Sequence, residues 1–508
     1  MSNSENNKRI AKNTLLLYFR MILTMLISLY TVRVVLKTLG VVDYGIYNVI
    51  GGVVAMFSFL SRTMSSASQR FFAFEIGNKN IAQLKKTFSL TITIYLGISL
   101  LVFILAETVG LWFLNAKMNI PIERMGAANW IYQFSIFSFI MTIMTIPYNA
   151  SIIAHENMKV FAYVSVFEVF MKLAIVYFLL LFPVDKLKLY SVLMFITTSI
   201  VTLVYRTLCY RKYEECRYKF IWDKSLFQKL MSYSGWNLFG TIASILNNSG
   251  INILLNIFFG PIVNAARAVA FQVNSTINQF VTNFITAVNP QITKYYANNE
   301  KENMIKLVFQ SSKLAYFLLF ILSMPVLLET HFILMLWLKQ VPENTILFVR
   351  LVILTAMIDS ISYPLMTSAQ ATGKIRHYQT IVGSVLLLNL PISYFFLHYG
   401  APPESTMYIS MAISVICLFL RVWILKGMID FPVSTFLKKI LYVLVVVSVL
   451  SYILPLTIVM TLDESFWRFA LVALISPLVS LSLIFLIGIN SAERNFLVTS
   501  VKNKILRK

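Results

Sequence analysis

The chain has 508 residues, of which 58% are hydrophobic and only 13% are charged, with a formal net charge of +22. So little polar surface could not cover the core of a soluble protein, which excludes soluble enzymes and large soluble domains. The positive charge does not indicate a nucleic-acid partner, because the basic residues lie in short loops between apolar runs, as in membrane proteins.

A helix needs roughly 20 apolar residues to cross the hydrocarbon of a bilayer, and runs of that length predict an all-α polytopic membrane protein with about 14 transmembrane helices. The first run, from Thr14, has no small-residue cleavage site, so we interpret it as a span and not as a removable signal peptide. The predicted spans are 13–36, 45–69, 87–114, 126–154, 160–182, 189–210, 230–258, 262–288, 307–335, 345–371, 377–399, 406–425, 440–460 and 467–489.

The distribution of Lys and Arg predicts the orientation of these spans. With the N-terminus inside, the inner segments hold 27 of the 43 Lys and Arg residues and the outer loops hold seven. Such a bias predicts a multi-pass protein of the inner (cytoplasmic) membrane with both termini in the cytoplasm. The most basic inner stretch, Arg206 to Lys229, is also the longest link and divides the chain near its middle.

An internal repeat supports this division. Gly40 and Gly260 occupy similar junctions at an offset of 220 in the numbering, and Ala154–Lys159 resembles Ala369–Lys374 at an offset of 215. Each copy holds six spans, an even number, which predicts two lobes related by a pseudo-twofold axis along the membrane normal. The predicted organisation is an N-terminal lobe at 1–215, a basic cytoplasmic linker at 216–229, a C-terminal lobe at 230–430, and two extra helices with a basic tail at 431–508.

Motifs for catalysis are missing from the sequence. It has no glycine loop that would cradle phosphate, no zinc-ligand spacing and no nucleophile elbow, so we expect neither an enzyme nor a metal or cofactor site. Pro147 and Pro364 interrupt spans 4 and 10 at an offset of 217. Proline frees a carbonyl and bends a helix, so this pair forms either a hinge in each half or simply a fixed bend.

Polar residues follow one face of two neighbouring spans. On span 7 they recur every four residues, and a similar row follows on span 8. Lipid cannot satisfy these amides, so they either bond between helices or line a watery cavity. We favour the cavity, in which amides would contact sugar hydroxyls. The predicted sugar-contacting residues are Asn248, Asn252, Asn256, Asn274 and Asn278, with Ser244, Asn264 and Arg267 on the same rows.

Charged residues within the predicted spans are mostly basic. A charge at mid-membrane costs at least about 2.5 kcal/mol, so an unpaired arginine there is a functional candidate. Arg70 and Arg421 lie near inner span ends, where their side chains could reach the headgroups. Arg20 and Arg267 are the strongest candidates for a cationic lumen, because Arg20 lies deep in span 1 and Arg267 shares its helix with the amide row. The further candidates are Arg33, Arg62 and Arg350.

Acidic residues well inside the spans are few. Glu168 and Lys172 lie four residues apart and are expected to neutralise each other. Asp359 lies one turn before Tyr363-Pro364, and two interpretations stay open: it binds a coupling proton or sodium ion, or it pairs with an arginine such as Arg350. A lumen of arginines and amides suits an anion that carries hydroxyl groups, because Arg pairs bidentately with phosphate.

One segment resembles a known family. Residues 33–47 (Arg-Val-Val-Leu-Lys-Thr-Leu-Gly-Val-Val-Asp-Tyr-Gly-Ile-Tyr), with Gly51-Gly52 and the span-2 ending Ser68-Gln69-Arg70-Phe71, closely resemble the first hairpin of the O-antigen-type polysaccharide-biosynthesis flippases. These belong to the multidrug/oligosaccharidyl-lipid/polysaccharide exporter superfamily. The resemblance implies two six-helix lobes as in the multidrug exporters (MATE-like), around a cationic cavity in which Arg20 and Arg267 look like lumen positions.

The resemblance also implies a substrate and a pathway. We expect a flippase that moves undecaprenyl-diphosphate-linked oligosaccharide from the cytoplasmic to the periplasmic leaflet by alternating access, for O-antigen or capsule synthesis, with a polysaccharide polymerase as a further partner. Two alternatives stay open: a multidrug cation antiporter of the same superfamily, which the scarcity of central acids disfavours, and a membrane glycan polymerase or ligase, which the short outer loops disfavour.

Overall fold

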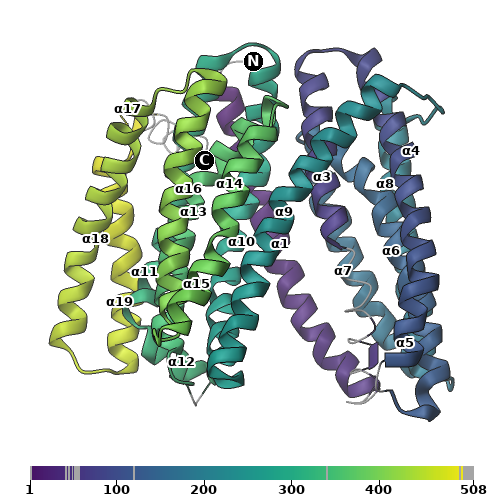
Figure 1. Ribbon diagram of the computed structural model, residues 1–508, viewed down its shortest axis with the longest axis horizontal. Helices are drawn as coiled ribbons and strands as arrows, with labels where there is room; N and C mark the ends of the chain where they lie inside the picture. Colours follow the sequence, from purple (N-terminus) through teal and green to yellow (C-terminus); the bar gives the residue numbers. More distant parts are fainter. Residues whose placement is uncertain are drawn as a thin grey trace, which may run out of the picture. The chain divides into compact units, whose positions relative to one another are not determined.

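The computed structural model describes residues 3–39, 43, 46–47, 50, 58–117, 120–338, 341–490 and 494–495. Among these residues every regular element is a helix and no strand occurs (Figure 1). The helices form two compact units, which we describe separately. Unit 1 comprises Met1–Thr241 and Thr286–Glu300, and unit 2 comprises Ile242–Ile285 and Lys301–Lys508.

Unit 1 is organised around α6, which packs against α3, α4 and α8, while α1 packs along α7. A single π turn, Ala106–Gly110, connects α4 to α5. The helices are α1 (Asn3–Leu39), α3 (Ser58–Gly77), α4 (Ile81–Leu105), α5 (Leu111–Lys117), α6 (Met125–Ala154), α7 (Met158–Leu181) and α8 (Lys186–Lys212), with the first part of α9 (Lys224–Phe259) and the last part of α10 (Pro261–Ala297).

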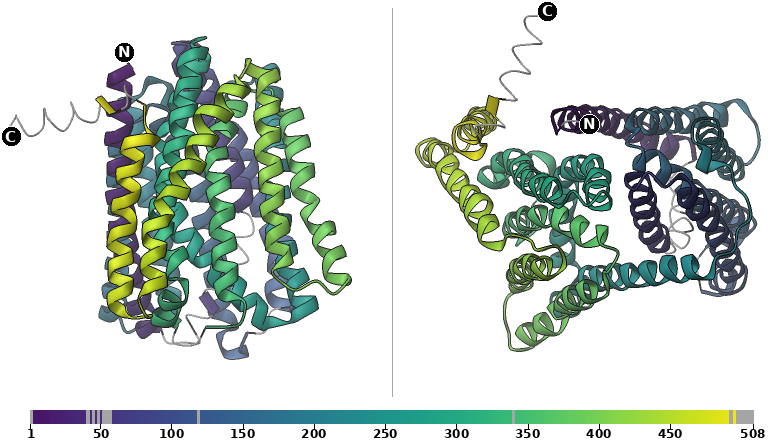
Figure 2. Two further views of the ribbon diagram at one scale, coloured as in Figure 1. Left: turned by 90° about the vertical axis from the view of Figure 1, so that its left-hand side faces the viewer. Right: turned by 90° about the horizontal axis from the view of Figure 1, so that it is seen from above.

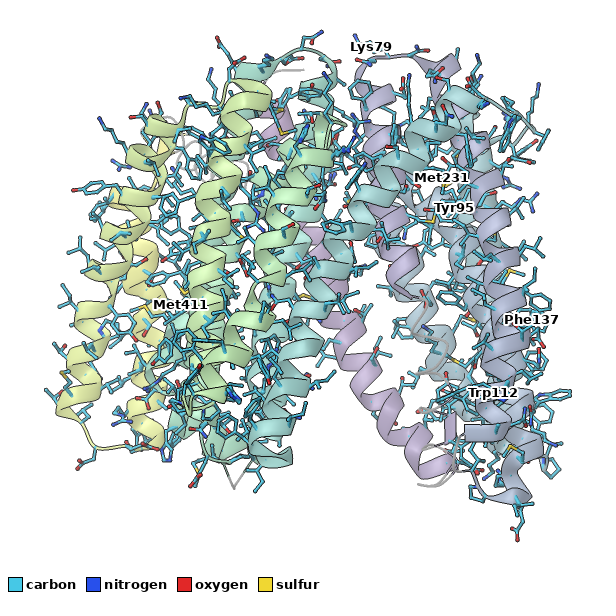
Figure 3. All side chains as sticks on the ribbon, in the orientation of Figure 1. Lys79, Tyr95, Trp112, Phe137, Met231 and Met411 are labelled. Atoms are coloured by element: carbon cyan, nitrogen blue, oxygen red, sulfur yellow. The ribbon has the colours of Figure 1, made fainter. Side chains whose placement is uncertain are left out.

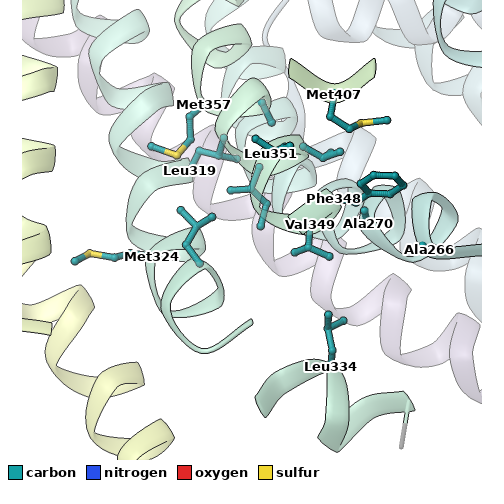
Figure 4. Packing of buried hydrophobic residues seen from close by; sticks show 14 of the residues in the cluster. Ala266, Ala270, Leu319, Met324, Leu334, Phe348, Val349, Leu351, Met357 and Met407 are labelled. Carbon is teal, nitrogen blue, oxygen red and sulfur yellow. The ribbon is translucent and has the colours of Figure 1, made fainter. Parts of the chain in front are cut away.

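Unit 2 is organised around α13, which packs against α11 and α16. Its apolar core includes Ala266 and Ala270 of α10 and Phe348 of α13 (Figure 4). Besides the remaining parts of α9 and α10, the helices are α11 (Lys301–Leu328), α12 (Thr330–Leu338), α13 (Thr345–Ala371), α14 (Arg376–Leu387), α15 (Asn389–His398), α16 (Ser405–Ile429), α17 (Val433–Phe436), α18 (Tyr442–Thr461) and α19 (Phe466–Leu483).

The two predicted C-terminal helices are present as α18 and α19. They lie side by side as a hairpin, drawn in yellow in Figures 1 and 2, and both pack against α11. Arg468 at the start of α19 donates from Nε and Nη2 to the two carboxylate oxygens of the buried Glu329, each at 2.8 Å. This bidentate pair is the strong form of a charge-assisted bond and fixes the hairpin to unit 2.

The turn geometry repeats between the units. The α3–α4 and α10–α11 turns each contain one residue in the left-handed region, Lys79 (φ 56°; Figure 3) and Asn299 (φ 59°), at an offset of 220 in the numbering. The α6–α7 and α13–α14 turns likewise place Glu156 (φ 59°) and Gly373 (φ 74°) in this region. The offset of this second pair is 217, so the predicted offset of 215 for this segment is too short by two. The predicted internal repeat is therefore present in the folded chain.

Twelve described stretches are long and apolar enough to cross a membrane. The described part of α3 and all of α10 are not among them, because polar residues interrupt both helices. These are the second helices of the two repeats. The all-α polytopic fold is thus confirmed, and the count of 14 spans is approximate. Part of the predicted span 45–69 lies outside the described residues.

Candidate functional site

Arg267 of α10 is a buried cation, with 8% of its surface exposed. Its guanidinium lies over the ring of Phe271, one turn further along, at 4.2 Å from the ring centroid. In the part of the chain that the structure describes, its Nε has no hydrogen-bond partner. A cation–π contact offsets part of the cost of burial, roughly 2 kcal/mol for a desolvated cation, but leaves the donors of the guanidinium available to an anion.

Amides flank Arg267 on the same face of α10. Asn264, Arg267, Phe271, Asn274 and Asn278 are separated by three or four residues, so they follow one stripe of the helix, which we call the α10 stripe. The buried Oδ1 atoms of Asn264 and Asn278 have no hydrogen-bond partner among the described residues. A buried polar atom without a partner costs about 1–3 kcal/mol, so this stripe is arranged for a ligand that donates hydrogen bonds.

The α10 stripe adjoins a second polar cluster inside unit 2. Nδ2 of Asn278 donates to the hydroxyl of Tyr363 on α13 at 3.1 Å. One turn before Tyr363, Asp359 is hydrogen-bonded to Ser414 and interacts electrostatically with Arg421. We call the group Asp359, Ser362, Tyr378, Ser414 and Arg421 the Asp359 cluster.

Arg421 lies inside unit 2 and not at a headgroup position. Only 6% of its surface is exposed, Nε donates to the Tyr378 hydroxyl at 3.2 Å, and Nη1 donates to Ser362 Oγ at 3.1 Å. The expectation that Arg421 reaches the headgroups is therefore wrong. It is also the arginine that accompanies Asp359, whereas Arg350 is exposed and donates from Nε to Thr330 Oγ1 at 3.2 Å.

The predicted amide row on α9 has a different environment. Asn248 and Asn252 are exposed, and Nδ2 of Asn248 donates to the Ser244 carbonyl of its own helix at 3.1 Å. The neighbouring Asn247 accepts from Asn389 of α15 at 2.6 Å, a contact between helices that the sequence analysis missed. Asn274 on α10 is half-buried, and the side chain of Asn256 lies outside the described residues.

In unit 1, Arg20 of α1 faces α7 and α8. Its guanidinium lies over the ring of Phe161 at 4.6 Å, with Glu168 and Tyr205 as electrostatic neighbours. Lys172 Nζ lies 2.5 Å from Glu168 Oε1, so the predicted neutral pair is present. The side chains of Arg33 and Arg62 lie outside the described residues.

The segment 33–47, which carries the family resemblance, makes one contact that sequence reasoning missed. Arg124, just before α6, binds both carboxylate oxygens of Asp43, with Nε 2.8 Å from Oδ1, and its Nη1 donates to Asp185 at 3.0 Å. Asp185 in turn caps α8 by accepting from the backbone N–H groups of Leu187 and Lys188, the second and third residues of the helix. Arg124 therefore connects Asp43 to the start of α8 and to its own position just before α6, all within unit 1.

Residues of the span-2 ending Ser68-Gln69-Arg70-Phe71, which also resembles the family, contact other helices of unit 1. Ser68 of α3 is hydrogen-bonded to the buried Tyr95 of α4 at 3.1 Å. Arg70 lies over Phe71 and Phe74 of its own helix and over Tyr233 of α9. In Figure 3, Tyr95 is labelled beside Met231, and both residues line the same small pocket between α3, α4 and α9.

Comparison with solved structures places this architecture among known folds. An outward-facing multidrug resistance MATE family transporter of the MOP superfamily superposes with a TM-score of 0.72 at 10% sequence identity, covering 84% of this chain and 96% of the other. The chain has the fold of the MATE transporters. A MATE in the straight conformation gives a TM-score of 0.70 at 11% identity, covering 83% of this chain and 97% of that one.

A third chain with this MATE fold differs in its described role. It is a MOP superfamily transporter from Pyrococcus furiosus, described as having a binding pocket of reverse polarity that suggests a different function. Its TM-score is 0.67 at 11% identity, with 85% of this chain and 96% of the other covered. Neither sequence-family models nor curated protein sequences gave a match. At such identities the likeness establishes the MATE fold alone.

Proposed function

We propose that this chain is a lipid-linked oligosaccharide flippase that works by alternating access in a bacterial cytoplasmic membrane. Its substrate would be a polyprenyl diphosphate that carries an oligosaccharide, moved toward the outer leaflet for surface polysaccharide synthesis. The fold supports the transporter class, because its solved relatives include MATE transporters in straight and in outward-facing conformations. A glycan polymerase that uses the translocated product is the expected partner.

The environment of Arg267 is the observation that carries the proposal. Its buried guanidinium contacts the ring of Phe271, and its Nε has no hydrogen-bond partner among the described residues. The stripe around it presents unpartnered amide oxygens, which accept hydrogen bonds from hydroxyl groups. A diphosphate beside a sugar offers both complements, since a guanidinium pairs bidentately with phosphate and the sugar hydroxyls donate to the amides.

The position of the α10 stripe supports its function. α10 and the described part of α3 are the two repeat-related helices outside the set that is apolar enough for a membrane. A helix with a row of amides and an arginine is unfavourable against lipid, so it belongs in the protein interior or beside water. The P. furiosus relative, described as having reverse polarity in its pocket, is a precedent for a change of pocket charge on this fold.

A multidrug cation antiporter is the second candidate, because solved relatives include a multidrug resistance transporter. A cation pocket needs a carboxylate that is free to bind the drug. Asp359 instead is hydrogen-bonded to Ser414 and interacts electrostatically with Arg421. We assign Asp359 to ion coupling: a proton or sodium ion that binds it would compete with Arg421 and could alter the α13–α16 contact.

The test is transport by purified protein in vesicles, with a fluorescent polyprenyl-diphosphate oligosaccharide whose exposure is followed by a membrane-impermeant quencher. Arg267→Gln should slow translocation by about tenfold or more, since a hydrogen bond to a charged group contributes about 1.5–3 kcal/mol. Arg267→Lys should retain part of the rate, because it keeps the charge and loses the bidentate fork. The exposed Arg376→Gln at the start of α14 is the matched control.

The outcomes separate the candidates. Normal translocation by Arg267→Gln with lost efflux of a cationic dye would reverse the assignment in favour of the antiporter. Normal activity in both assays would remove Arg267 from the site. Imposing a proton or a sodium gradient on the same vesicles identifies the coupling ion, and Asp359→Asn should abolish the acceleration by that gradient.

A further inference from the structure

The linker between α8 and α9 carries an unusual surface. After the short helical turn Glu214–Cys216, residues 217–223 are non-helical and lead into α9. Three aromatic side chains alternate along this linker and stay exposed: Tyr218 (41%), Phe220 (70%) and Trp222 (58%). Arg217 immediately precedes the first ring and Lys219 lies between the first two, and both are exposed as well. We call Arg217–Trp222 the aromatic–basic segment.

This segment lies along α4. The backbone N–H of Lys219 donates to Ser89 Oγ at 3.4 Å, and the Tyr218 hydroxyl lies 3.3 Å from Thr93 Oγ1. Its start is fixed by the buried Glu215, whose Oε1 lies 2.5 Å from His155 Nε2. Figure 1 shows the linker passing beside α4 on its way to α9. The exposed rings are therefore held in place by contacts within unit 1.

The depth of the segment follows from the length of the helical stretch that α4, the π turn and α5 form together. The continuous stretch Ile81–Ala116 has 36 residues, which is about 54 Å of helix at 1.5 Å per residue. Hydrocarbon accounts for roughly 30 Å of this length, which leaves about 12 Å at each end if the helix is centred. Ser89 lies eight residues after Ile81, again about 12 Å. The segment therefore lies level with the boundary between headgroups and acyl chains.

We propose that the aromatic–basic segment is an interfacial anchor that binds the anionic headgroup layer of the membrane. Aromatic rings prefer this boundary, and a basic residue there is attracted to anionic lipid phosphates. Tyr218, Phe220 and Trp222 contact the upper acyl and glycerol region, while Arg217 and Lys219 pair with phosphates. A headgroup layer explains both the exposed rings and the exposed basic side chains. The contacts of the segment with α4 place it at the depth of this layer.

The inference is independent of the flippase proposal, and its test needs no transport substrate. The full-length protein with Phe220→Cys is labelled with a bimane fluorophore and reconstituted in vesicles of phosphatidylcholine alone or with phosphatidylglycerol added. The three native cysteines are buried. The same label on Asn298→Cys, at an exposed position in the α10–α11 turn, is the reference. Aqueous iodide reports exposure to water, and brominated lipids report contact with acyl chains.

We expect the label at 220 to be protected from iodide and quenched by brominated lipid, more strongly with phosphatidylglycerol, whereas the label at 298 stays accessible. Neutralising Arg217 and Lys219 by R217Q/K219Q should weaken this protection about fivefold for each charge removed. The variant K301Q/K306Q removes two exposed charges from the start of α11 and should leave the protection unchanged.

Three results would overturn the anchor. One is equal iodide access at positions 220 and 298 in anionic vesicles. A second is protection of the same size in phosphatidylcholine alone, which would remove the anionic headgroup from the proposal. The third is protection that appears only when a cytosolic protein fraction is added, which would identify a protein and not the lipid as the occupant.

Discussion

Three buried or half-buried arginines show how differently this chain accommodates a cation away from water. Arg421 has a carboxylate neighbour in Asp359 and donates to two hydroxyls. Arg20 has the ring of Phe161 and the carboxylate of Glu168 nearby. Arg267 has the ring of Phe271, and no hydrogen bond to its Nε occurs among the described residues. Only the environment of Arg267 lacks an anion, which is the reason to expect one from outside the protein.

The Asp359 cluster gives a prediction about stability at the residue scale. Removing one partner of a buried charge pair leaves the other uncompensated and costs about 3–5 kcal/mol, whereas removing both costs much less. Asp359→Asn and Arg421→Met should therefore each lower the melting temperature in detergent, and the double variant should recover most of the loss.

A double variant whose loss equals the sum of the two single losses would show that these side chains do not interact. Ser384→Ala on α14, an exposed position in unit 2, is a suitable control for the effect of mutation as such. It should leave the melting temperature unchanged, because no buried polar group loses its partner.

The arginine that accompanies Asp359 shows where sequence reasoning at this scale ends. Arg350 lies nine residues before Asp359, which is two and a half turns of α13 and places it on the opposite face of the helix. Periodicity alone excludes this pair. Arg421 was expected near a span end because the predicted span stopped at 425, whereas α16 continues to Ile429. Its contact with Asp359 is tertiary, and no local pattern predicts it.

At the scale of elements, one ion cluster fastens the end of α10 within unit 1. Glu156, in the α6–α7 turn, is buried, with Arg9 Nε 2.8 Å from Oε2 and Lys294 Nζ 2.6 Å from Oε1. Its backbone carbonyl accepts from Asn13 of α1 at 3.1 Å. Gly77 at the end of α3 approaches the same part of α10 so closely that a Cβ would lie 2.8 Å from that of Ala297.

Glu156→Gln should therefore destabilise unit 1. The amide cannot neutralise Arg9 and Lys294, and the loss of one partner of a buried ion pair costs about 3–5 kcal/mol. Thermal unfolding in detergent measures the loss, with the exposed Glu302→Gln in the first turn of α11 as the control. Equal melting temperatures for the two variants would contradict the role of this cluster.

The attachment of the α8–α9 linker should depend on pH. Burial alone raises the pKa of the Glu215 carboxyl, but hydrogen bonds from His155, Ser151 and its own backbone N–H outweigh it and lower the pKa below its ordinary value. A carboxyl whose pKa is lowered by folding stabilises the folded state above its unfolded pKa. It loses that contribution as the pH falls through the folded pKa.

The comparison of wild type with Glu215→Gln measures this dependence. The difference between their melting temperatures should be present at neutral pH and should shrink below about pH 4.5, near the unfolded pKa of a glutamate. In the neutral range the difference should correspond to about 1–3 kcal/mol, the range for hydrogen bonds to charged groups and for buried groups left without a partner. If the difference in melting temperature grows on acidification, the pKa of Glu215 is raised by folding and not lowered.

Most element boundaries could be predicted from apolar periodicity, but two predicted spans each divide into two helices. The predicted span 377–399 divides into α14 and α15 at Leu388, where Pro391 has no N–H to donate to the preceding turn. The predicted span 307–335 divides into α11 and α12 at Glu329, which pairs with Arg468. Proline signals the first break in the sequence itself, whereas the pairing of Glu329 with a residue 139 positions away is tertiary and no local pattern predicts it.

At the scale of the whole chain, the repeat is present and the two copies differ in chemistry. Thr145 of α6 and Thr202 of α8 share a hydrogen bond of 2.7 Å in unit 1. The corresponding positions in unit 2, at offsets of 217 and 219, are Ser362 and Arg421, joined at 3.1 Å. The contact between α6 and α8 in unit 1 thus joins two hydroxyls, whereas the corresponding contact between α13 and α16 in unit 2 joins a hydroxyl and a guanidinium. The sequence could predict the repeat, but not this exchange of partners, because the aligned identity is too weak to pair single residues.

Pro147 and Pro364 occupy one position of the repeat. Each lies inside its helix nine residues before the left-handed residue of the following turn, Glu156 and Gly373. Both prolines are buried among helices, and the carbonyl of Pro364 accepts from Ser368 Oγ at 2.9 Å. A proline removes one helix hydrogen bond, which permits bending at that point or fixes a permanent bend.

Substitution by alanine distinguishes a hinge from a fixed bend. If each unit bends at its proline during transport, Pro147→Ala and Pro364→Ala should each slow translocation about tenfold, because the restored backbone bond stiffens the helix by roughly 1–1.5 kcal/mol. Protection of the protein by substrate against thermal unfolding should stay unchanged, since neither proline belongs to the α10 stripe. Because the positions are equivalent, the two variants should behave alike, and Pro477→Ala in α19 of the C-terminal hairpin should transport normally. Normal translocation with a shifted melting temperature would instead assign both prolines to helix shape.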